Sequence, residues 1–192
     1  MSDIAERLIV ASVPTVLSLL LVWLVGLRLS DFWASRRKKR DLELAAAESF
    51  YACYGEFCAV WKEWNYLCSK MAMEGQAGFR ERKTILLERA CRAEGALEGV
   101  LLKIASEISL TQEEADELGN LRQAYQVLRE RIQKNGKIPY AYSGDKNYAE
   151  FKRLATFVSS LLCRGSYRRP TRTQAAEMFI FITNNSHEEK WR

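Results

Sequence analysis

One uninterrupted apolar run dominates the first 40 residues. No charged side chain lies between Arg7 and Arg28, and most of Leu8–Leu27 is Leu, Val or Ile. A helix of that length extends about 30 Å, which matches the hydrocarbon core of a bilayer. We therefore predict a transmembrane helix over residues 8–29, preceded by a short extracytoplasmic segment, residues 1–7. A cleaved signal peptide is the alternative, but it favours a basic start and a shorter apolar core.

A basic juxtamembrane segment, residues 30–40, follows the apolar run. Its five consecutive basic residues are Arg36, Arg37, Lys38, Lys39 and Arg40, whereas only Arg7 precedes the run. Because basic flanks stay in the cytoplasm, we expect a single-pass membrane protein with its N-terminus outside and its C-terminal domain cytoplasmic. Trp33 lies where an interfacial aromatic residue is expected. The expected partner of this segment is the lipid bilayer, and the basic cluster also favours anionic lipid.

Small residues recur along one face of the predicted membrane helix. Ala11, Thr15, Ser18 and Gly26 follow one another at helical spacings, with Val22 completing the series. Small side chains let helices approach closely in lipid, so this face is a candidate for association between membrane helices.

From residue 41 onward apolar side chains recur at alternating spacings of three and four, which is typical of a packed helix seam. The first seam consists of Ala47, Phe50, Tyr54, Phe57, Trp61, Trp64, Cys68 and Met71. The next helix, roughly residues 79–108, carries Leu86, Ala90, Ala93, Leu97, Val100 and Ile104. We expect these two helices to form an antiparallel hairpin, with the aromatic side chains of one against the small residues of the other. No Gly or Pro lies between Gly26 and Gly55, so the membrane helix can continue into this seam.

Three further helices are predicted by their end signals. Thr111 with Glu114 resembles a capping box, and the helix it opens ends at Asn135-Gly136. Another helix covers about 147–164, and Thr171 with Gln174 opens the last one, through about Asn184. The predicted class is therefore all-α: a transmembrane helix followed by a cytoplasmic antiparallel bundle, residues 41–192, with coiled-coil-like seams and no sheet.

Charge and motifs argue against several functions. Residues 1–40 carry seven basic and three acidic side chains, a net +4, whereas residues 41–192 carry 22 and 21, a net +1. The basicity thus belongs to the membrane junction, and no nucleic-acid partner is expected. His187 lies in a polar tail, and the odd number of cysteines indicates free thiols. With no motif for catalysis, metal or cofactor binding, we expect neither an enzyme nor a cofactor.

Two segments could contact a ligand or partner. Arg164, Arg168, Arg169 and Arg172 cluster between helices without an acid among them. Such a cluster could contact an anion or a partner surface, but a solvated loop is the favoured interpretation. The tyrosine-rich segment Pro139–Tyr148 is either a contact surface or packing over the end of the bundle.

The function these patterns favour is that of a membrane-anchored helical interaction module. It would hold a cytoplasmic protein partner, or its own oligomer, at the membrane. The alternative is a membrane-acting effector, whose cytoplasmic bundle senses a signal and drives clustering of the membrane helices. That layout resembles the small membrane-anchored effectors of bacterial anti-phage and toxin systems in architecture only, with no shared motif.

Overall fold

A computed structural model describes residues 2–70, 76–136, 145–163, 169–184 and 191. Its five helices are α1 (Ser2–Lys70), α2 (Gln76–Glu107), α3 (Gln112–Gln133), α4 (Lys146–Cys163) and α5 (Arg172–Thr183). The described residues contain no strand, so the all-helical class is confirmed for them. The chain divides into two compact units, Met1–Leu42 and Glu43–Arg192.

The unit Met1–Leu42 consists of the first part of α1. This helix runs without a break from Ser2 to Lys70, as the absence of Gly and Pro after Gly26 predicted. The described side chains between Leu21 and Leu29 are exposed and mostly large and apolar. Among the residues described, no helix is both long enough and apolar enough to cross a membrane. The side chains of residues 8–17, 19 and 20 of the predicted span lie outside that description.

Both predicted capping boxes are confirmed in the unit Glu43–Arg192. At the start of α3 the Glu114 amide donates to Thr111 Oγ1 at 3.2 Å, and the Thr111 amide donates to Glu114 Oε2 at 3.0 Å. Thr171 and Gln174 form the same pair at the start of α5. These bonds satisfy amides that have no partner inside the helix, which fixes where each helix begins.

The core of this unit is an aromatic cluster that joins α1, α3 and α4. The ring of Phe57 lies 4.3 Å from that of Tyr125 and 4.5 Å from that of Phe151, measured between centroids. Trp61 contacts Tyr148, at 5.5 Å, on the same side of α1. The two rings that contact Phe57 come from α3 and α4. This part of the seam was predicted to face the small residues of α2, but it packs against α3 and α4.

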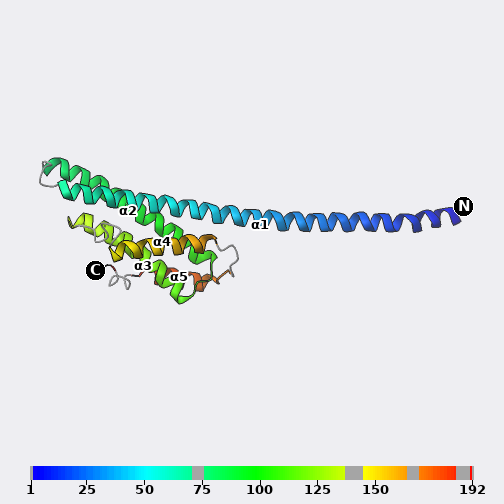
Figure 1. Ribbon diagram of the computed structural model, residues 1–192. Helices are drawn as coiled ribbons and strands as arrows, with labels where there is room; N and C mark the ends of the chain where they lie inside the picture. Colours follow the sequence, from blue (N-terminus) through cyan, green and yellow to red (C-terminus); the bar gives the residue numbers. More distant parts are fainter. Residues whose placement is uncertain (1, 71–75, 137–144, 164–168, 185–190, 192) are drawn as a thin grey trace. The chain divides into compact units, whose positions relative to one another are not determined.

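The antiparallel arrangement of α1 and α2 is confirmed. Trp64, late in α1, contacts Phe79 at the start of α2, whereas Glu56 pairs with Arg89 farther along α2. The two helices lie side by side over the part of α1 that follows residue 43 (Figure 1). The predicted partner was wrong for Phe57 and Trp61, which pack against α3 and α4, whereas Trp64 does contact α2. The α1 residues that face α2 across the groove include Ala46 and Cys53.

Trp191 closes the bundle in a way that sequence reasoning missed. It is 1% exposed, and its indole Nε1 donates to the Asn120 carbonyl at 2.8 Å. A tryptophan within a short polar tail is the signal that could have indicated this burial, because a large aromatic ring gains most from leaving water.

Replacing Trp64 tests the packing of the seam. This residue is fully buried, and its Nε1 donates to the Gly136 carbonyl at 2.9 Å, so it also holds the end of α3. Trp64→Ala is expected to lower the free energy of unfolding by about 3–5 kcal/mol. Urea unfolding of residues 41–192, followed by circular dichroism, measures this. Tyr66→Ala, at a position 59% exposed in the same helix, is the control and should cost under about 0.5 kcal/mol. A cost below about 1 kcal/mol for Trp64→Ala would place its ring on the surface.

Candidate functional site

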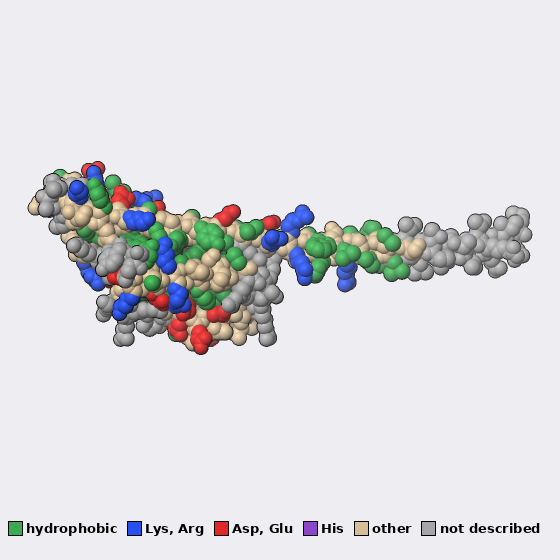
Figure 2. Space-filling view, in the orientation of Figure 1, with side chains coloured by type: hydrophobic (Ala, Val, Ile, Leu, Met, Phe, Trp, Pro, Cys, Tyr) green, Lys and Arg blue, Asp and Glu red, His purple; other side chains and the backbone are tan. Residues whose placement is uncertain are grey.

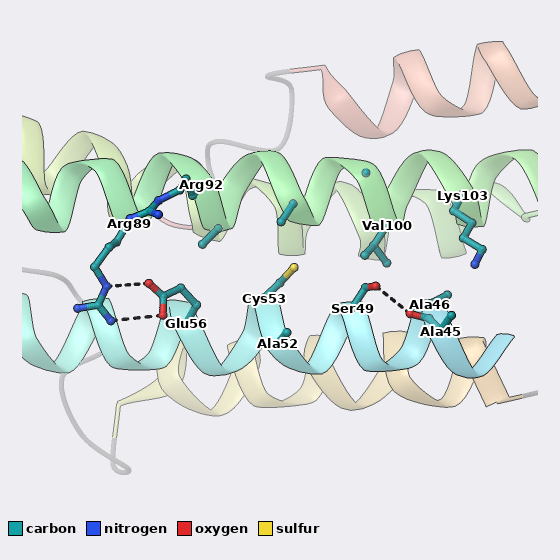
Figure 3. Close-up of a pocket in the computed structure, with 13 residues that line it drawn as sticks. Ala45, Ala46, Ser49, Ala52, Cys53, Glu56, Arg89, Arg92, Val100 and Lys103 are labelled. Atoms are coloured by element: carbon teal, nitrogen blue, oxygen red, sulfur yellow. Dashed lines mark hydrogen bonds and ion pairs between the residues drawn. The ribbon is translucent and has the colours of Figure 1, made fainter. Parts of the chain in front are cut away.

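A groove of about 740 Å³ runs between α1 and α2 (Figure 3). Its lining residues recur at helical spacing on each helix, so that two stripes face one another. The α1–α2 groove is lined by Ala45, Ala46, Ser49, Ala52, Cys53 and Glu56 of α1, and by Arg89, Arg92, Ala93, Ala96, Gly99, Val100 and Lys103 of α2. Seven of these 13 side chains are Ala, Gly or Ser, which explains why the space between the helices stays open.

The groove has a buried floor and an exposed wall. Ala46, Cys53 and Val100 are buried and form part of the core beneath it. Ala52 and Ala96 are exposed on either side. The side chain of Val100 points toward α1, and that of Cys53 toward α2 (Figure 3). Burial raises the pKa of the Cys53 thiol, which keeps it protonated and poorly reactive.

Two glycines lie in the interior of α2, and one of them, Gly99, lines the groove. Gly95 and Gly99 are exposed in the interior of α2, and a Cβ atom added at either would meet nothing within 4 Å. Glycine in a helix interior costs roughly 0.5–1 kcal/mol relative to alanine.

Charged side chains stand at the edges of the groove. Arg89 bridges the two helices, with its Nε 2.7 Å from Glu56 Oε1 and its Nη1 2.6 Å from Glu63 Oε2. The hydrogen bond from Arg89 lowers the pKa of the Glu56 carboxyl below its ordinary value. The stabilisation from this ion pair is therefore fully present at a pH above the ordinary carboxyl pKa, and it is lost as the pH falls through the lowered pKa. Lys103 points into the gap at the other end (Figure 3).

The charge of the lining is positive. Three basic side chains, Arg89, Arg92 and Lys103, face one acidic side chain, Glu56, which gives a net +2. Arg92 is exposed, and its positive charge also lowers the pKa of Glu56. The charge of Arg89 is held by Glu56 and Glu63.

The described residues contain no cluster of three or more His, Cys, Asp or Glu placed to hold a metal ion. All five cysteines are free thiols. The groove combines small apolar side chains with basic edges, which suits the recognition of a surface.

The predicted membrane-interface residues lie on the first part of α1. Arg36, Arg37 and Arg40 are exposed, and the Arg36 guanidinium lies 4.4 Å over the Phe32 ring. Trp33 is 62% exposed. Basic side chains gather beside apolar ones on this stretch of α1 (Figure 2). The side chains of Lys38 and Lys39 lie outside the described residues.

The predicted association face is described only in part. Val22 and Gly26 are exposed, and a Cβ atom at Gly26 would meet nothing within 4 Å. Ser18 is exposed on the same helix. The side chains of Ala11 and Thr15 lie outside the described residues.

The structure describes only part of the arginine cluster and of the tyrosine-rich segment. Arg169 and Arg172 are exposed before and at the start of α5, whereas Arg164, Arg168 and His187 lie outside the described residues. Tyr148, from the tyrosine-rich segment, packs on Trp61, and the Lys152 ammonium lies 5.4 Å from the centre of its ring. For Tyr148 the packing interpretation therefore holds, and residues 137–144 lie outside the description.

Sequence reasoning missed the α1–α2 groove. It placed Ala93 and Val100 in a seam filled by aromatic side chains, and it gave no role to Gly95 and Gly99.

Alanine at the two glycines tests whether the groove is open. Gly95→Ala and Gly99→Ala should each raise the free energy of unfolding by about 0.5–1 kcal/mol, since the new methyl group meets no neighbour. Urea unfolding of residues 41–192 measures both. Destabilisation at Gly99 that grows with protein concentration would indicate that a second copy already fills the groove.

Comparisons with known proteins add no relative. No family model matches the chain, and neither a curated protein nor a solved structure is significantly similar to it.

Proposed function

We propose that this protein is a membrane-anchored interaction module that holds a protein partner at the cytoplasmic face of a membrane. The observation that carries the proposal is the α1–α2 groove, which is lined by small side chains and has the exposed Gly99 on its α2 side. A folded bundle gains nothing by itself from glycine at this position, whereas a bound partner gains close contact.

The sequence of α1 supports the membrane part of the proposal. Leu8–Leu27 has the length and the apolar character of a spanning helix, and five basic residues follow it. Exposed apolar side chains from Leu21 to Leu29 would be costly in water and favourable in lipid. The basic residues 36–40 would then lie among headgroups, with the bundle beyond them.

Topology reporters test the anchor and its orientation. A fusion at residue 192 is expected to report a cytoplasmic C-terminus in intact cells, because the positive charge after the span resists translocation. Neutral replacements at residues 36–40 should scramble the orientation, while neutral replacements at Arg169 and Arg172 serve as the control. A chain that washes off membranes at high salt, or a reporter active only outside, would contradict the proposal.

The second candidate is an effector in which the membrane helices cluster. The observation that favours it is the exposed face of Ser18, Val22 and Gly26 on α1, where a Cβ atom added at Gly26 would meet nothing within 4 Å. In lipid such a face allows two helices to approach closely. A signal received by the bundle would then bring the helices together and disturb the bilayer.

A double substitution separates the two candidates. Ser18→Leu with Gly26→Leu should abolish energy transfer between labelled chains in membranes if the face associates, because the bulky side chains keep the backbones apart. Leu20→Val with Leu24→Val, on other positions of the helix, is the matched control. Equal, monomer-like transfer from wild type and variant would remove the effector and leave the plain anchor.

A further inference from the structure

We infer that the outer face of α1 packs against the same face of a second copy of the chain, with the two helices antiparallel. The outer face is the line of exposed residues Leu44, Glu48, Tyr51, Gly55, Ala59, Lys62 and Tyr66. The inference goes beyond the proposed function and concerns the unit Glu43–Arg192 alone, so it does not depend on the membrane anchor.

The outer face is the side of α1 that the other helices leave uncovered. Its residues follow one another at intervals of three and four, which keeps them on one side of a helix. On one edge the Tyr51 hydroxyl shares a hydrogen bond of 2.7 Å with Ser159 of α4. On the other edge Glu63 pairs with Arg89 of α2 at 2.6 Å. The surface between these two contacts is open to a further helix.

Three large apolar side chains stand on the outer face. Leu44, Tyr51 and Tyr66 are 56%, 50% and 59% exposed. Among the described residues of α1 after position 43, no other large apolar side chain is exposed. Single exposed apolar residues are common on protein surfaces, whereas apolar residues gathered on one face favour an interaction surface.

Two unpaired charges of opposite sign lie on the same face. Neither Glu48 nor Lys62 forms an ion pair within the described part of the chain, whereas Glu56 is held by Arg89. Fourteen residues separate Glu48 from Lys62, which is about 21 Å along the helix, so the two cannot pair within one chain. Each lies seven residues from Gly55, in opposite directions.

An antiparallel pair with its two-fold axis at Gly55 compensates both charges. Each position then meets the one at the same distance on the other side of the axis, so Glu48 of each chain faces Lys62 of the other. A parallel pair would place Glu48 against Glu48 and Lys62 against Lys62, which opposes association. The face has no net charge, so it favours neither an acidic nor a basic surface over a second copy. The Glu43 ends lie at opposite ends of the contact, and anchored chains would approach it from opposite sides.

The apolar positions fit the same register. Leu44 of one chain meets Tyr66 of the other, and Tyr51 meets Ala59, which sets a large side chain against a small one. At the axis the two Gly55 residues place no side chain between the backbones. The contact extends about 33 Å along α1, or six helical turns.

Sedimentation of the full chain in a mild detergent at low salt, over a series of concentrations, measures the dimer. Glu48→Lys and Lys62→Glu should each raise its dissociation constant at least about tenfold, because each sets like charges face to face. The double variant, Glu48→Lys with Lys62→Glu, should restore the wild-type constant, since the ion pairs form again with their direction reversed. Glu177→Lys, at an exposed position of α5, makes the same charge change and should leave the constant unchanged.

A bulky residue at the axis tests the close approach of the helices. A Cβ atom at Gly55 meets nothing within 4 Å in its own chain, so Gly55→Leu should leave the bundle folded by circular dichroism. The same change should raise the dissociation constant at least about tenfold, or 1.4 kcal/mol. Gly95→Leu, at an equally open position of α2, is the matched control and should have no effect.

Cross-linking reports the direction of the pair. Cys91→Ser with Cys163→Ser first removes the exposed thiols. In this background, chains with Leu44→Cys are mixed with chains with Tyr66→Cys and oxidised. A disulfide should join the two kinds of chain in the mixture, and neither kind should link to itself.

Several results would overturn the inference. They are a monomer at every concentration, a dimer that ignores both charge reversals, and single reversals that the double variant does not correct. A disulfide between two Leu44→Cys chains would make the pair parallel. A dimer that only Ser18→Leu with Gly26→Leu dissociates would place the contact in the membrane helices. None of these results changes what the topology reporters measure, so the membrane proposal stands or falls separately.

Discussion

The contact of Phe57 with Tyr125 and Phe151 is the interaction on which the bundle depends. All three rings are at most 1% exposed, and they join α1, α3 and α4, segments far apart in the chain. Burying large aromatic side chains supplies much of the free energy that orders a domain of this size. The cluster also fixes the rotation of α1, because one face of the helix must point into it.

That rotation decides what α2 meets. The aromatic face of α1 is turned toward α3 and α4. On the side of the groove, Ala46, Ser49 and Cys53 of α1 face Ala93, Ala96 and Gly99 of α2. Neither stripe has side chains large enough to fill the space between the helices. The packing of the aromatic core therefore produces the groove. The groove side of α1 carries small side chains, whereas the opposite side carries aromatic ones.

Ion pairs hold the helices around this opening. Arg89 joins α2 to Glu56 and Glu63 of α1, and Arg122 joins α3 to Glu98 of α2 at 3.0 Å. Such partly exposed pairs add little stability, but they orient the helices. They lie along the same two helices that line the groove.

The sequence by itself determined the helices. Spacings of three and four, capping pairs at Thr111 and Thr171, and the lack of breakers after Gly26 predicted the helix ends within a few residues. These signals are local, because capping and periodicity act within one or two turns. Only the tertiary structure decided that Phe57 faces α3 and α4, that Trp191 is buried and that Gly99 lines a groove. Each depends on which distant helix a face meets, and the apolar pattern of one helix does not specify that partner.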